Sequence, residues 1–117
     1  MDPEIILVES PITRPQLAEI AARRFGDMAK AVVDVARGVM AIGGELHSDE
    51  EAFLLERGSR QQDLWGINLY PDPGAPELVE FDSMINLRPS QRNRSRSVDD
   101  PAIREQILAL VRKLILP

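Results

Sequence analysis

The segment from Glu80 to Ser97 contains the residue types that could bind or process a phosphorylated ligand. It begins as an alternating strand with two carboxylates, Glu80 and Asp82, and ends as a loop rich in arginine. Paired carboxylates can hold a divalent cation or transfer a proton, and guanidinium groups bind phosphate oxyanions. The same combination of charges could instead be a salt-bridged element of the fold.

The loop has a local charge of +4, and its serines and asparagine favour turns with free N–H groups. Backbone N–H groups and guanidinium groups together suit an anionic ligand, such as a nucleotide, a phosphosugar or an RNA phosphate. Neither a Walker sequence nor a G-x-G-x-x-G sequence is present, so this is not a diagnostic phosphate loop. We predict an anion site built from Asn86, Arg88, Arg92, Arg94, Ser95 and Arg96.

A structural role for the same arginines is the alternative, because carboxylates lie nearby in the sequence. Asp99 and Asp100 follow the loop, and a second acidic group occupies residues 49–51. Ion pairs with these groups would make the loop an ordinary part of the surface. On this alternative, the protein would be a non-catalytic interaction module or a homodimer that uses an open sheet face.

Glu80 and Asp82 are the candidates for catalysis or metal binding. Two residues apart on a strand, they are separated by about 6.5–7 Å, so both can reach one cation. They could bind a divalent cation together with a substrate phosphate, or act as a general acid and base. His47 is a further metal candidate, but it is the only histidine, and catalytic zinc sites normally use more than one. Whether the protein is an enzyme is left open.

Length and composition favour one ordinary globular domain over residues 1–117. The net charge is −5, which disfavours non-specific nucleic-acid binding. No apolar stretch approaches the roughly 20 residues of a membrane span, and the start of the chain lacks the features of a secretory signal. We therefore expect a cytoplasmic protein that does not insert into a membrane.

Hydrophobic periodicity and turn residues predict the elements that position these groups. Capping boxes at Thr13–Gln16 and Ser48–Glu51, and Asp100 followed by Pro101, mark three helix starts. The order β-α-β-β-α-β-β-α, with two hairpins, predicts an α+β fold. We expect a two-layer sandwich, with a mixed, largely antiparallel sheet and all helices on one face. The expected strands are 4–8, 30–36, 39–46, 64–70 and 78–88.

The period of two within a strand predicts which side chains share a face. The polar face of the last two strands would present Asn68, Tyr70, Glu80, Asp82, Asn86 and Arg88. The helix-free face of an open antiparallel sheet is normally polar and solvated, so this face could be either a ligand site or an ordinary surface.

The chain resembles an uncharacterised family of small prokaryotic proteins classed as a domain of unknown function. The resemblance covers nearly the whole chain and rests on residues 44–49, 63–71, 80–91, 93–96 and 100–105. It implies no activity, cofactor or catalytic residue. The family tends to have glycine where this chain has Arg92, and glycine can adopt a turn that arginine resists.

Overall fold

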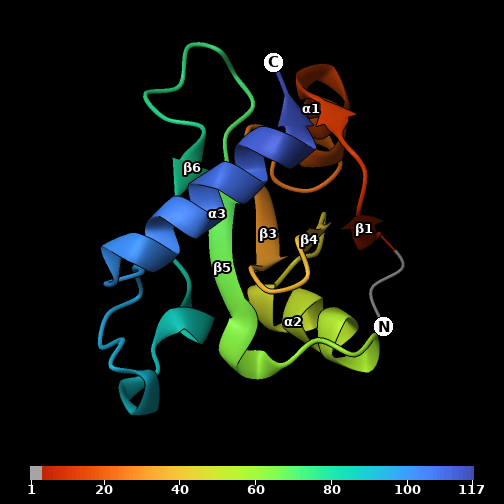
Figure 1. Cartoon of the computed structure of the whole chain (residues 1–117). Coiled ribbons are helices and arrows are strands. Elements are labelled where there is room, and N and C mark those ends of the chain that lie inside the picture. Colours follow the sequence, from red (N-terminus) through yellow and green to blue (C-terminus); the bar gives the residue numbers. More distant parts are fainter. Residues whose placement is uncertain (1–3) are drawn as a thin grey trace.

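The structure is a computed structural model that describes residues 4–117, and a five-stranded antiparallel sheet forms its centre (Figure 1). The strands are β1 (Ile6–Val8), β2 (Ile12–Thr13), β3 (Ala29–Asp34), β4 (Val39–Ile42), β5 (Leu64–Leu69), β6 (Val79–Glu80) and β7 (Ile115–Leu116). The central sheet has the order β1-β4-β3-β5-β6. The short strands β2 and β7 pair in parallel and attach the C-terminal end of the chain beside the first helix.

Three α-helices pack around this sheet: α1 (Arg14–Ala22), α2 (His47–Glu56) and α3 (Pro101–Leu114). The predicted capping box at the start of α1 is confirmed, because the Thr13 hydroxyl accepts from the Gln16 amide and the Gln16 side chain accepts from the Thr13 amide. Asp100 caps α3 as predicted by accepting from the Ala102 amide at 2.8 Å.

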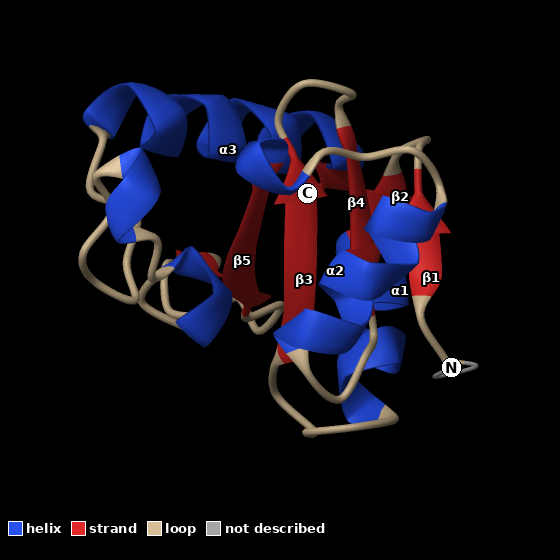
Figure 2. Ribbon diagram, turned by 90° about the horizontal axis from the view of Figure 1, so that it is seen from below, coloured by secondary structure: helices blue, strands red, loops and turns tan. Residues whose placement is uncertain are grey.

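The α+β class and the mostly antiparallel sheet are confirmed, but the prediction that all helices cover one face is wrong. Leu17 of α1 and Ile107 of α3 belong to one core cluster, whereas Phe53 of α2 belongs to a second. Figure 2 shows α3 along one side of the strands. The reason lies in β4, whose four residues are all buried and apolar, so both sheet faces need a cover.

The start of α2 also differs from the prediction. The helix begins at His47, its N-cap is Leu46, and no side chain caps it, so the predicted box at Ser48–Glu51 is not formed. Instead, the Glu50 carboxylate reaches back and accepts from the Gly44 amide at 2.9 Å. The helix thus begins before Ser48, and its first amides have no side-chain acceptor.

The strand predicted over residues 78–88 is mostly absent, because only Val79 and Glu80 pair with β5. The chain then turns into the short 3₁₀ helix η2 (Met84–Asn86), which the Ser83 hydroxyl caps. The Asn86 side chain replaces the missing strand: it accepts from the Gly66 amide at 2.8 Å and donates to the Gly66 carbonyl at 2.9 Å.

No helix within residues 4–117 has the length and apolar character needed to cross a bilayer. The prediction made from the start of the chain rests mainly on residues 1–3, which lie outside the described residues.

Candidate functional site

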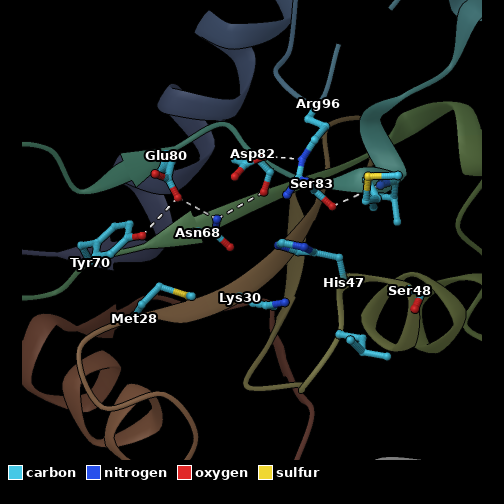
Figure 3. A pocket seen from close by; sticks show the side chains of 13 residues that line it. Met28, Lys30, His47, Ser48, Asn68, Tyr70, Glu80, Asp82, Ser83 and Arg96 are labelled. Atoms are coloured by element: carbon cyan, nitrogen blue, oxygen red, sulfur yellow. Dashed lines mark hydrogen bonds and ion pairs between the residues drawn. The ribbon is translucent and has the colours of Figure 1, made fainter. Parts of the chain in front are cut away.

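A cavity of about 380 Å³ lies where the N-terminus of α2 meets the ends of β5 and β6. We call it the α2 pocket, and its size falls in the range of small-molecule sites. Figure 3 shows its side chains, which come from the sheet, from α2 and from the segment after β6. The lining residues are Met28, Lys30, Leu46, His47, Ser48, Asn68, Tyr70, Glu80, Asp82, Ser83, Met84, Ile85 and Arg96.

One wall of the α2 pocket is a hydrogen-bonded acidic group. Asn68 of β5 is the register partner of Glu80 in β6, and its side-chain amide donates to the Glu80 carboxylate at 2.9 Å. The Tyr70 hydroxyl donates to the same carboxylate oxygen at 3.1 Å. The structure therefore brings together Asn68, Tyr70, Glu80 and Asp82, as the period of two in the sequence suggested.

Asn68 leaves one polar atom unused. Its amide nitrogen donates to Glu80 and also to the Asp82 carbonyl at 3.2 Å. Its Oδ1 atom has no hydrogen-bond partner, although the residue is only 6% exposed. In Figure 3 this oxygen points away from the two carboxylates, toward the side of the pocket that holds Lys30 and His47. An unsatisfied buried acceptor costs about 1–3 kcal/mol, so a donor from a ligand would be stabilising here.

The wall on the β3 and α2 side of Asn68 is electropositive. Lys30 of β3 is the register partner of Asn68, and its ammonium group lies 5.4 Å from the centre of the Phe25 ring. The uncapped start of α2 contributes His47 and Ser48 to the same wall, with the positive end of the helix dipole. Arg96 completes the rim, where its Nε donates to Asp82 at 2.7 Å.

His47 is buried against β5 and is held in one tautomer. Its Nε2 lies 2.8 Å from the Ile67 carbonyl oxygen, which can only accept, so Nε2 carries the proton. Burial is the main cause that lowers the His47 pKa below its ordinary value of 6.5, and the charge of Lys30 acts in the same direction. The hydrogen bond to Ile67, the charge of Asp82 and the Asn68 side chain oppose this effect. The ring is therefore neutral at pH 7.

Because the His47 pKa is lowered by folding, the unfolded chain binds a proton more readily than the folded one. We expect the free energy of unfolding to decrease as the pH falls below 6.5, since the folded state must then take up an unfavourable charge. His47→Gln should reduce this loss. Urea unfolding of both proteins between about pH 5.5 and about pH 7.5 measures the effect. An identical pH dependence in the variant would contradict the assignment.

The four arginines of the predicted anion loop do not converge on one cavity. Arg88 is largely buried and forms an ion pair with Glu51 at 3.3 Å, while its other nitrogens donate to the Ile85 and Gln61 carbonyls. Burial lowers the pKa of Arg88, and the charge of Glu51 raises it. Arg88 thus joins α2 to the loop, in the structural role that was the alternative interpretation.

Arg92 and Arg94 are exposed and do not line the α2 pocket. Arg92 has a φ angle of 61°, and no other non-glycine residue in the described range has a positive φ. The turn that favours glycine is therefore present, and arginine adopts it at some cost in strain. Of the four arginines, Arg96 is the one that lines the pocket.

The remaining predicted anion ligands are used within the fold. Asn86 is fully buried and bonded to Gly66 and to the Arg96 carbonyl. The Ser95 hydroxyl donates to Asp99 at 2.6 Å. Hydrogen bonds from Ser95 and from the Arg94 amide lower the pKa of Asp99 below its ordinary value. These contacts leave neither Asn86 nor Ser95 directed at a ligand.

The metal candidates share the α2 pocket but do not form a ligand group. Glu80, Asp82 and His47 all line it. Within residues 4–117, however, no three His, Cys, Asp or Glu side chains are grouped closely enough to hold a metal ion. A divalent cation that Glu80 and Asp82 share with a ligand phosphate stays a prediction.

The sequence did not single out Lys30 or the N-terminus of α2. Within the apolar strand β3, Lys30 is the one charged residue before Asp34 at its end. This charge in an otherwise apolar segment was the feature of the sequence that could have indicated a functional lysine. Its meaning depends on β3 lying beside β5, because that pairing places Lys30 opposite Asn68.

A family model described as a protein of unknown function (DUF5674) matches residues 6–114. Neither the curated proteins nor the solved structures gave a match to the chain.

Proposed function

Because the chain belongs to DUF5674, a family of proteins of unknown function, its role has to be argued from the site, and we propose that it binds a small phosphorylated ligand in the α2 pocket. The observation that carries the proposal is the meeting, in one cavity, of Lys30, the uncapped start of α2 and the unpaired oxygen of Asn68. Helix N-termini and ammonium groups bind phosphate oxygens.

In this proposal Lys30 and the amides at the start of α2 receive the anion, and Arg96 covers it from the rim. The proposal keeps the anionic ligand predicted from the sequence but moves the site from the arginine loop to the helix. A partner surface on an open sheet face has less support, because α2 covers much of the face that was expected to be free.

Lys30→Met should weaken phosphate binding by about tenfold, because it removes a charge-assisted hydrogen bond from a half-buried position. Lys113→Met is the matched control, since Lys113 is the other lysine and is exposed at the end of α3. Titration with inorganic phosphate, a sugar phosphate and a nucleotide, followed by amide NMR shifts, measures affinity and location together. The largest shifts should lie at His47 and Ser48.

Arg94→Ala separates this proposal from binding at the arginine loop. Arg94 is exposed and outside the pocket, so its loss should leave phosphate affinity unchanged. Shifts centred on residues 92–96 that disappear in Arg94→Ala, with phosphate or with a short RNA, would assign binding to the loop instead. No shift with any compound at millimolar concentration would refute ligand binding at the α2 pocket.

A further inference from the structure

The two walls of the α2 pocket carry opposite charges that are not matched inside the protein. Arg96 and Asp82 neutralise each other through their ion pair. Neither Lys30 nor Glu80 takes part in an ion pair found among residues 4–117. The cavity therefore presents one ammonium group on the β3 side and one carboxylate on the β6 side.

The carboxylate side also contains the unsatisfied acceptor. The Asn68 amide nitrogen and the Tyr70 hydroxyl both donate to the same oxygen of Glu80, so the donors of these two side chains are already used within the protein. What remains is acceptor capacity, namely the buried Oδ1 atom of Asn68 and the charge of Glu80, two residues that line the cavity. A ligand group that fits both must donate hydrogen bonds, and a positive charge on that group would complement Glu80.

The Asn68 side chain interacts with His47 and raises its pKa, but the neutral ring does not supply the missing donor. Its single proton is on Nε2 and is directed at the Ile67 carbonyl, so the neutral ring has no second N–H for Asn68. Lys30 is the cross-strand neighbour of Asn68, but its ammonium group lies beside the Phe25 ring, and Asn68 Oδ1 has no hydrogen-bond partner. The buried, unpaired oxygen of Asn68 thus indicates a ligand independently of the helix N-terminus.

From these contacts we infer that the ligand of the α2 pocket is zwitterionic, with an anionic phosphate toward Lys30 and α2 and a primary ammonium group toward Asn68 and Glu80. The inference rests on the proposed phosphate binding and adds the chemistry of the other end of the ligand. An ammonium group has three N–H donors, so one group can serve both Asn68 Oδ1 and the Glu80 carboxylate.

Three phosphate esters of similar length test the inference with purified full-length protein: O-phosphoethanolamine, 2-hydroxyethyl phosphate and propyl phosphate. They end in an ammonium, a hydroxyl and a methyl group, respectively. We expect the ammonium ester to bind about tenfold more tightly than the methyl ester, because it adds charge-assisted hydrogen bonds, with the hydroxyl ester between them. Calorimetric titration or NMR shifts give the three affinities.

Glu80→Gln should bring the affinity ratio of the ammonium ester to the hydroxyl ester close to one, since it removes the charge and keeps the shape of the side chain. Glu77→Gln is the matched control, because Glu77 is exposed and lines a neighbouring cavity but not the α2 pocket. The control should keep the wild-type ratio. Thermal unfolding of both variants checks that they are folded.

The possible outcomes separate the two proposals. If all three esters bind equally well, or the methyl or hydroxyl ester binds best, phosphate binding stands and the zwitterionic ligand is refuted. An ammonium preference that persists in Glu80→Gln also refutes the assigned position. If no ester binds, and inorganic phosphate does not bind either, the proposed function itself is wrong.

Discussion

Asn86→Ala is expected to lower the free energy of unfolding by about 3–5 kcal/mol, which is a large fraction of the stability of a small domain. Asn86 is fully buried, and its side chain satisfies both the amide and the carbonyl of Gly66 in β5. Alanine would leave these two backbone groups buried without partners, at about 1–3 kcal/mol each. It would also remove the bond to the Arg96 carbonyl, which holds the loop against the sheet.

Equilibrium urea unfolding measures this loss, and the single tryptophan, Trp65, is buried next to Gly66 and gives the fluorescence signal. Asn86→Asp keeps the shape and the acceptor but turns the donor into a carboxylate oxygen that faces two carbonyls, so it should also destabilise. Ser90→Ala, at an exposed position, should change stability by less than about 0.5 kcal/mol. A loss below about 1 kcal/mol for Asn86→Ala would show that water replaces its amide.

Gly66→Ala should be as damaging, through crowding instead of lost hydrogen bonds alone. A Cβ atom at position 66 would lie 2.5 Å from Ser83 Cβ and 3.1 Å from Ile85 Cγ1. Ser83 and Asn86 would have to move away from β5, which would break the bonds between Asn86 and Gly66. Overpacking costs about 1–3 kcal/mol, and the lost hydrogen bonds bring the total to about 3–5 kcal/mol.

Gly74→Ala is the matched control for this substitution. Gly74 lies in the loop between β5 and β6. The nearest atom to an added Cβ there would be Asp72 Oδ1, at 3.4 Å, which is an ordinary van der Waals contact. It should unfold at nearly the wild-type urea concentration. Because Ser83 and Ile85 lie against position 66, Gly66→Ala should also shift their amide resonances. Wild-type stability with unchanged resonances would mean that the segment after β6 is not packed on Gly66.

Much of the fold could be predicted because the signals are local. The capping residues Thr13 and Asp100 begin α1 and α3 as expected, since each bonds to an amide within three residues. Strand periodicity also placed Asn68 and Glu80 on one face, and they are register partners. The family resemblance is confirmed by the match over residues 6–114. Interactions between near neighbours are encoded in the order of residues and need no knowledge of the tertiary structure.

The errors have a common physical origin in contacts between distant residues. The alternating pattern after Glu80 suggests a long strand, but the chain turns at Ser83, whose amide donates to the Arg96 carbonyl. Arg88 resembles an anion ligand in sequence, yet its partner is Glu51, which lies 37 positions away. Neither partner is visible from the residue types alone, because any carboxylate or carbonyl of the chain could have filled the role.

The sequence by itself determined the order of the three helices and of the five strands of the central sheet, the α+β class and the polar face of β5 and β6, because periodicity and capping are short-range properties. Only the tertiary structure decided that α2 lies on the second face of the sheet, where its uncapped start meets Lys30, Asn68 and Arg96. A strand that is apolar on both faces requires a cover on each, but it does not say which helix supplies it. The packing of α2 on the polar face of the sheet creates the pocket.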